Sequence, residues 1–325
     1  MNSSSLAMAD KFDYRKWPNC LAALMMSLNC ALGFMFNGSI IYVFLVDKPQ
    51  RSSSFNLMCA IRAFNSIAAL TTSFLLVYIP HALLGFSLYP PWLESILVCL
   101  SLNFYLFNEF QSIYISINRF IAIYCPRYYE KTCGLGATIL IHLVLLADRA
   151  QNVGFETYDR INQEKYISFS PEYLMFTALE VSGSGLVLKF GIMFLIALTA
   201  NLLTFLKITI FYLKSGPFDD VEKFKRIQKN GKLFFQTVLQ DGLFFVDNFF
   251  TFNMSGLIDH RFWFFICASF VWQTMHVIDG FIMIMFNDRL FVLRSSLFPS
   301  SAKVSATETS AGKVSPNRLS LPDVA

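Results

Sequence analysis

The 325-residue chain has little charge, with Asp, Glu, Lys and Arg making up only 15% of its residues. Soluble domains carry about 25% charge. Here 55% of the residues are apolar and the mean hydropathy is +0.49. The composition predicts a multi-pass protein of the lipid bilayer, and the net charge of +4 reflects its loops rather than a nucleic-acid partner.

Other patterns are missing as well. The alternation of apolar and polar residues that a transmembrane barrel needs is not seen. Four histidines form no HExxH pair or ligand cluster, and GxSxG is lacking. The seven cysteines are scattered without metal-type spacing. We therefore predict that the chain is not an enzyme, with no catalytic residue, no metal and no cofactor.

Seven apolar segments have the length of about 20 residues that a transmembrane helix needs, or approach it. We expect an all-α membrane protein, a seven-transmembrane helix bundle. The fourth segment is short because Asp148 and Arg149 follow it. The predicted spans are 21–46, 57–84, 95–124, 134–147, 186–213, 233–252 and 262–286.

Lysine and arginine are unevenly shared between the alternate loops. If the N-terminus is outside, the inner segments hold 16 of the 26 and the outer segments 7. This bias predicts an outside N-terminus and an inside C-terminus, with the first span an uncleaved signal anchor. We expect an extracellular tail over 1–19, a receptor-like membrane domain over 20–298 and a disordered cytoplasmic tail over 299–325.

Two Asn-x-Ser triplets fall on the predicted outer side. They begin at Asn2 and Asn253 and are candidate glycosylation sites.

Polar residues inside the predicted spans are candidate functional groups, because they are costly in lipid. Gly33 and Asn37 share one helical face, as a packing pair or as part of a polar network. Arg119 ends the third span, as a headgroup anchor or as a switch. The acids Glu109, Asp241 and Asp247 either contact a ligand or pair internally, with Lys189 and Lys207 as available partners.

Five blocks of sequence resemble the serpentine receptor class x chemoreceptors of nematodes, within the rhodopsin-like receptors. The resemblance runs from about residue 33 to 297, and the blocks in spans six and seven are the most specific. They are FNLMCAIRAFN, INRFIAIYCPRYY, ALTANLLTFLKI, LFFQTVLQDGLFFVDN and WQTMHVIDGFIMIMFNDR.

The resemblance implies roles for particular residues. Asn118, Arg119 and Phe120 stand where rhodopsin-like receptors have Asp-Arg-Tyr, so Arg119 is the expected coupling switch without its usual acidic neighbour. Asp279 and Gly280 stand where the seventh helix has Asn-Pro. The outer loop at 147–185 lacks the cysteine that usually ties it to the third helix.

Around Asp279 we expect either a polar network that repacks on activation or a static cluster, with Asn37, Asn65 and His276 as neighbours. Glu109, Asp247 and Phe249 are the candidate ligand-pocket residues. The aromatic residues near the outer ends of spans six and seven face lipid or shape that pocket.

The predicted function is that of a chemosensory receptor. It binds an external small-molecule or peptide ligand and activates a heterotrimeric G protein, at the plasma membrane and, by resemblance, at the cilia of sensory neurons. A transporter or channel for a small solute is the alternative, although matched, broken half-helices are not visible.

Overall fold

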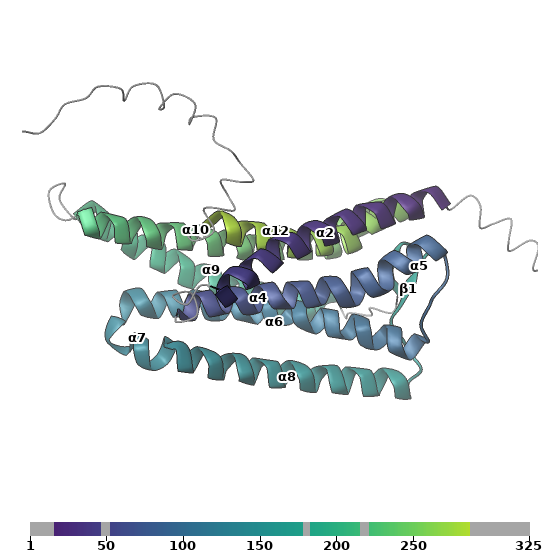
Figure 1. The fold of residues 1–325 in the computed structure, drawn as a ribbon, viewed down its shortest axis with the longest axis horizontal. Helices are drawn as coiled ribbons and strands as arrows, with labels where there is room; N and C mark the ends of the chain where they lie inside the picture. The colour runs from purple at the N-terminus through teal and green to yellow at the C-terminus, as the bar shows by residue number, and fades with distance from the viewer. Residues whose placement is uncertain (1–15, 47–52, 178–182, 215–220, 287–325) are drawn as a thin grey trace, which may run out of the picture.

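The computed structural model describes residues 16–46, 53–177, 183–214 and 221–286, which form a long helical bundle with one short hairpin (Figure 1). In chain order the elements are α2 (Lys16–Val46), α4 (Ser54–Ala69), η1 (Leu70–Tyr78), α5 (Ile79–Leu84), α6 (Pro91–Tyr124), α7 (Pro126–Cys133), α8 (Leu135–Asn162), β1 (Ser168–Ser170), β2 (Met175–Thr177), α9 (Gly183–Lys214), α10 (Val221–Phe249), η2 (Phe250–Met254), η3 (Ser255–Leu257), α11 (Arg261–Phe264), η4 (Phe265–Phe270) and α12 (Val271–Phe286).

Most of these rods are long and apolar enough to cross a membrane. Five pass on their own: α2, the run from α4 to α5, α6, α9 and the run from α11 to α12. The bent pair of α7 and α8 makes a sixth. The remaining rod, α10, begins with the polar stretch VEKFKRIQKNGK and packs against α9, α12 and α6. It completes a seven-rod bundle within the described residues.

The fourth rod differs from the prediction in its end point. The apolar segment at 134–147 stops at Asp148 and Arg149, but α8 continues to Asn162. Arg149 pairs with Asp148 at 2.5 Å and places its guanidinium 4.9 Å from the Phe110 ring centroid on α6. Because Asp148 and Arg149 have partners, they do not interrupt the helix. The end of the apolar segment is therefore not the end of α8.

Proline shapes the second rod. The turns of η1 are π-helical, and the amide of Ile79 bonds to the carbonyl of Phe74, five residues back. Pro80 follows and has no amide hydrogen to donate, which is a common setting for such irregular turns. The rod ends at Gly85, whose φ of 76° is in the left-handed region that glycine adopts without strain.

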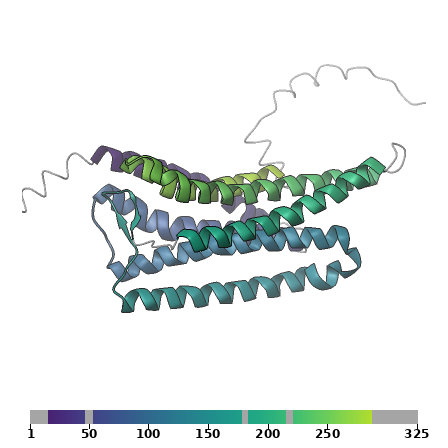
Figure 2. The same ribbon diagram turned by 180° about the vertical axis from the view of Figure 1, so that it is seen from behind.

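A β-hairpin closes one end of the bundle. β1 and β2 are antiparallel, with Phe169 opposite Phe176 and both rings buried. In the two opposite views the hairpin and the start of α2 lie at the same end, while α7 lies at the other (Figures 1 and 2). We call these the hairpin end and the α7 end.

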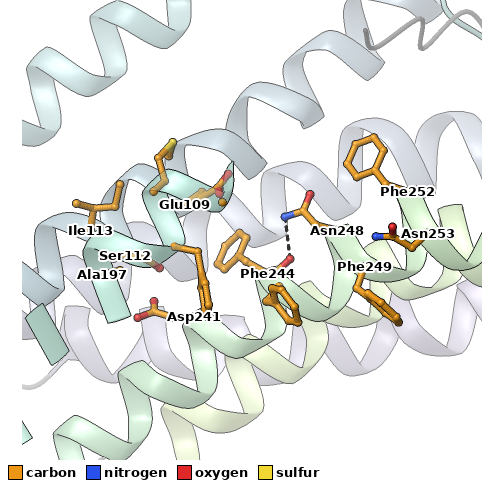
Figure 3. Close-up of a pocket in the computed structure, with 14 residues that line it drawn as sticks. Glu109, Ser112, Ile113, Ala197, Asp241, Phe244, Asn248, Phe249, Phe252 and Asn253 are labelled. Atoms are coloured by element: carbon orange, nitrogen blue, oxygen red, sulfur yellow. Dashed lines mark hydrogen bonds between the residues drawn. The ribbon is translucent and has the colours of Figure 1, made fainter. Parts of the chain in front are cut away.

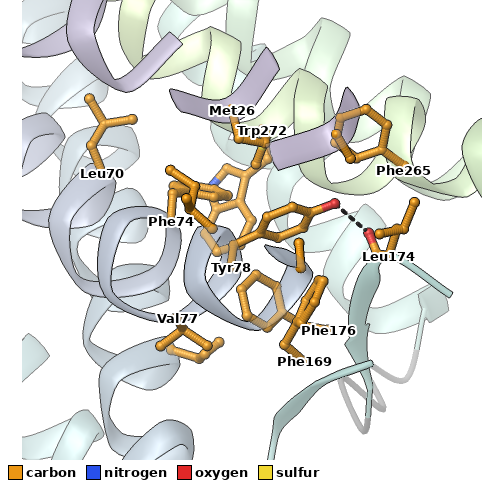
Figure 4. Close-up of a cluster of buried hydrophobic side chains, with 14 of the residues drawn as sticks. Met26, Leu70, Phe74, Val77, Tyr78, Phe169, Leu174, Phe176, Phe265 and Trp272 are labelled. Carbon is orange, nitrogen blue, oxygen red and sulfur yellow. Dashed lines mark hydrogen bonds between the residues drawn. The ribbon is translucent and has the colours of Figure 1, made fainter. Parts of the chain in front are cut away.

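The main apolar core lies beneath the hairpin. Phe74 and Tyr78 of η1 meet Trp272 of α12, with ring centroids of Phe74 and Trp272 4.9 Å apart (Figure 4). Tyr78 also packs on Phe169, 4.4 Å away, and donates its hydroxyl to the carbonyl of Leu174 at 3.0 Å. The hairpin is thus part of the core rather than a loose loop.

Large apolar side chains cover the outside of the bundle. On α8 and α9 alone, Leu140, Leu143, Val144, Ile192 and Leu195 are all more than half exposed. Soluble proteins rarely expose contiguous apolar surface of this kind, whereas lipid accommodates it. The exterior therefore agrees with the bilayer environment that composition predicts.

Candidate functional site

A buried ion pair lies at the centre of the bundle. Arg62 of α4 donates from Nε to both carboxylate oxygens of Asp279 of α12, at 2.9 and 2.8 Å. Its Nη1 donates to Ser112 Oγ of α6 at 2.7 Å. Gln240 of α10 donates to Asp279 Oδ1 at 2.8 Å. One pair of charges thus connects four helices.

This pair is almost completely removed from solvent, with Arg62 1% and Asp279 4% exposed. The Arg62 guanidinium also lies 5.2 Å from the ring centroid of Phe244. Charges at this depth are stable only when they are paired and hydrogen-bonded. A shift of any of the four helices therefore has to break or exchange a strong contact.

The residues predicted around Asp279 lie nearby but bond to other groups. Asn65 donates to Asn108 Oδ1 of α6 at 2.9 Å. Asn37 donates to the backbone carbonyl of His276 at 3.1 Å and to that of Gly33 at 3.0 Å. The side chains that bond to Asp279 are those of Arg62 and Gln240, which were not predicted as its partners.

Gly280, next to Asp279, allows α12 to lie against α2. A Cβ atom at that position would stand 2.8 Å from the side-chain atoms of Asn37. That spacing is too short for a real Cβ contact, so a larger residue would displace Asn37 from the His276 carbonyl.

Arg119 sits near the end of α6 and points into the bundle. Its Nη1 donates to Thr237 Oγ1 of α10 at 2.6 Å, and its guanidinium carbon lies 5.1 Å from the Phe55 ring centroid of α4. The Nε and Nη2 atoms are buried. Arg119 thus connects α6 with α10 and α4 at the α7 end.

The neighbours of Arg119 make separate contacts. Asn118 accepts a hydrogen bond from the Tyr129 hydroxyl of α7 at 3.4 Å. Phe120 stacks on Tyr124 with ring centroids 4.4 Å apart. Within the part of the chain that the structure describes, no hydrogen bond joins the side chains of Asn118 and Arg119, which fits the loss of the acid at that position.

A cavity of about 350 Å³ lies between α6, α9 and α10 (Figure 3). It extends from Asp241, deep in α10, to Asn253 in η2. The lining residues are Glu109, Ser112, Ile113, Gly191, Met193, Phe194, Ala197, Asp241, Phe244, Phe245, Asn248, Phe249, Phe252 and Asn253.

Two of the three predicted ligand-pocket residues line this cavity. Glu109 and Phe249 belong to its wall, whereas Asp247 is buried but is not a lining residue. Asp241 lines the cavity instead. On an α-helix Asp247 lies six residues from Asp241, which places the two acids on different faces.

The candidate glycosylation sites differ in what the structure says of them. Asn253 is exposed in η2 and lines the hairpin end of the cavity. Asn2 lies outside the described residues.

The hairpin is held without a disulfide. All seven cysteines lie in the described residues, and each is free. At the start of α6, Glu94 accepts the backbone N–H of Phe169, and Ser95 accepts that of Ile167 at 3.2 Å. Ser87 donates to the other oxygen of Glu94 at 2.8 Å. Hydrogen bonds from α6 thus take the place of the covalent tie.

Seven rods, six of them apolar enough to cross a membrane, surround a buried charge pair, and a cavity lies between three of them. This arrangement defines a seven-transmembrane receptor bundle. A scan against protein-family models matches residues 28–287 to the family described as "Serpentine type 7TM GPCR chemoreceptor Srx". The chain belongs to this family, and both the predicted resemblance and the seven-helix fold class are confirmed. Comparison with curated proteins gives no match.

Arg62 was not among the candidate residues predicted from the sequence. The signal was present, because Arg62 is the only charged residue of span two and Asp279 the only one of span seven. Two opposite charges, each alone in an apolar helix, favour each other as partners. Asn108, Ser112 and Gln240 had no comparable signal, since uncharged polar residues are common in spans.

Proposed function

We propose that this chemoreceptor-family protein binds an external small-molecule cue in the cavity between α6, α9 and α10 and activates a heterotrimeric G protein at the α7 end. The observation that carries the proposal is the double role of Ser112, which lines the cavity and accepts a hydrogen bond from Arg62. A ligand against Ser112 therefore changes the contacts of the central ion pair.

A second connection runs along α10. Asp241 lines the cavity, and the preceding residue, Gln240, donates to Asp279. One turn toward the α7 end of α10, Thr237 accepts from Arg119. A ligand that shifts α10 thus reaches both the ion pair and Arg119 through adjacent turns of one helix.

Activation in this proposal is a shift between two arrangements of the bundle, and the ligand favours one of them. In the second arrangement α10 moves away from α6, Arg119 leaves Thr237, and the surface at the α7 end opens to the G protein. The polar contacts around Arg62 and Asp279 are the part that repacks. The plasma membrane, including that of sensory cilia, is the proposed location.

The test measures ligand-evoked G-protein dissociation in cells that express the full chain, with solute uptake recorded in parallel. Signalling without uptake supports the receptor. We expect Arg119→Ala to abolish signalling at unchanged surface expression. Thr237→Val removes the hydroxyl that accepts from Arg119 and that also donates to the Phe234 carbonyl within α10. We expect it to raise basal output about tenfold or less, since one hydrogen bond contributes roughly 1 kcal/mol.

Asn118→Asp probes the altered motif next to Arg119. An aspartate would offer the charge that Asn118 lacks, and its attraction for Arg119 would stabilise the inactive arrangement. We expect lower basal output than in the wild type. The proposed mechanism would be overturned if Asn118→Asp left basal output unchanged and Arg119→Ala signalled fully. Solute uptake without signalling would favour the transporter.

A further inference from the structure

The lining of the cavity has charge of one sign only. Glu109 and Asp241 both belong to its wall, and none of the described lining residues is lysine, arginine or histidine. Ser112, Asn248 and Asn253 add neutral polar groups, and the rest of the wall is apolar or aromatic. Such a wall accepts a positive group and disfavours a negative one.

The described interior of the bundle carries more acid than base. Among the described residues, Arg62 is a buried arginine and Arg119 a partly buried one, while five carboxyl groups are buried, those of Glu94, Glu109, Asp241, Asp247 and Asp279. Arg62 is committed to Asp279. A buried carboxylate is stabilised by positive charge nearby, and Glu109 and Asp241 face the cavity.

Asp241 has the geometry of an anchoring group. It is 6% exposed, and its Oδ2 accepts a hydrogen bond from Asn201 of α9 at 2.8 Å. Its Oδ1 is buried and accepts no hydrogen bond of standard geometry among the described residues, with Ser112 as the polar group beside the carboxylate and Arg62 and Arg119 as the nearby positive charges. Figure 3 places Asp241 below Ser112 at the deep end of the cavity, well away from Asn253. One oxygen is held by the protein, and the other remains as an acceptor.

We propose that the cue is a small amphipathic amine, whose ammonium group binds Asp241 Oδ1 and whose apolar body lies along Phe244 and Phe249. This inference rests on the proposed function and deepens it by naming the class of ligand. Twelve residues of helix separate Asp241 from Asn253, about 18 Å at 1.5 Å per residue. The aromatic faces along this path add attraction for a cation.

The test uses purified full-length receptor in phospholipid nanodiscs. The probes are primary amines with apolar bodies of about six to twelve carbons, each matched with the alcohol and the carboxylate of the same body. Binding is measured as the shift in the thermal unfolding midpoint against probe concentration. We expect amines to bind at least tenfold more tightly than their alcohols, which is about 1.4 kcal/mol, and carboxylates to bind least.

Asp241→Asn keeps the shape of the side chain and an oxygen for Asn201 but removes the charge. We expect this variant to bind amine and alcohol equally. Asp247→Asn is the matched control, because Asp247 is a buried acid of the same helix that does not line the cavity. Loss of amine preference in Asp247→Asn and its retention in Asp241→Asn would overturn the assignment of the anchor.

Gly191→Leu tests the cavity itself and keeps the proposal falsifiable if Asp241→Asn does not fold. A Cβ at Gly191 meets nothing within 4 Å, and Gly191 lines the cavity. The leucine should fill the space and weaken amine binding about tenfold or more. Gly242→Leu is the control, since Gly242 also has open space but is not a lining residue.

The outcomes separate this inference from the proposed function. Equal binding of amines and alcohols, or no binding of any probe, overturns the inference about the ligand class. If another cue still evokes signalling, the proposed receptor function stands. Amine binding that depends on Asp241 but never dissociates a G protein overturns the proposed function and leaves the ligand class standing.

Discussion

Arg62 and Asp279 show how a single pair of residues constrains a whole bundle. Each alone would be an isolated charge in lipid, which is expensive, and together they satisfy each other and hold Ser112 and Gln240 in place. The energetic asymmetry is large. Removing one partner of a buried pair leaves the other uncompensated, whereas replacing both by apolar residues is often neutral.

This asymmetry gives a prediction at the residue scale. Arg62→Met and Asp279→Leu should each lower the free energy of unfolding by about 3–5 kcal/mol. The double variant should be more stable than either single one. Thermal unfolding of the three variants in detergent, monitored by size-exclusion of the folded fraction, measures the coupling. Additive losses in the double variant would show that the two charges do not depend on each other.

The sequence predicts which polar residues matter better than it predicts their partners. Asn37, His276 and Asp279 were expected to lie together, and they do lie in adjacent turns of α2 and α12. The sequence could not show that Asn37 bonds a backbone carbonyl or that Arg62 reaches Asp279. Such contacts depend on helix rotation and on side-chain rotamers, which apolar periodicity does not determine.

At the scale of elements, the hairpin of β1 and β2 acts as a fixed cover over the core. Its two strands have three residues each, too short to leave a strand signal in the sequence. Most of the helices were predictable because their apolar runs match the bilayer thickness, and the fourth, whose run is short, was predicted with the wrong end point. Residues 147–185 contain no cysteine that could tie the hairpin to the third rod. Hydrogen bonds hold it instead: Glu94 of α6 accepts from the Phe169 amide, and Tyr78 of η1 donates to the Leu174 carbonyl.

Glu94→Ala should loosen this cover. It removes the acceptor of the Phe169 amide and of the Ser87 hydroxyl. Hydrogen bonds to a charged group contribute about 1.5–3 kcal/mol, so we expect hydrogen exchange in residues 163–177 to speed up by roughly ten- to a hundredfold. Glu164→Ala, at an exposed glutamate just before the hairpin, is the control. Equal exchange in both variants would mean that Glu94 does not hold the hairpin.

For the whole molecule, the bundle has two chemically different ends. The hairpin end carries the apolar core, the outer part of the cavity and the start of α2. The α7 end carries Arg119, and Lys207 there donates to the carbonyl of Ile123 at 2.9 Å, near the end of α6. A positive side chain at the C-terminus of a helix complements the helix dipole.

We predict that the N-terminus is outside and that the hairpin end faces the exterior. An epitope tag before residue 1 should be detected on intact cells, and a tag after residue 325 only after permeabilisation. Deglycosylation should reduce the apparent mass, and Asn2→Gln and Asn253→Gln should each remove part of that reduction. Asn253 is the sharper probe, because it lies on η2 at the outer part of the cavity. A C-terminal tag accessible on intact cells would reverse the predicted orientation and contradict the placement of the α7 end on the cytoplasmic side.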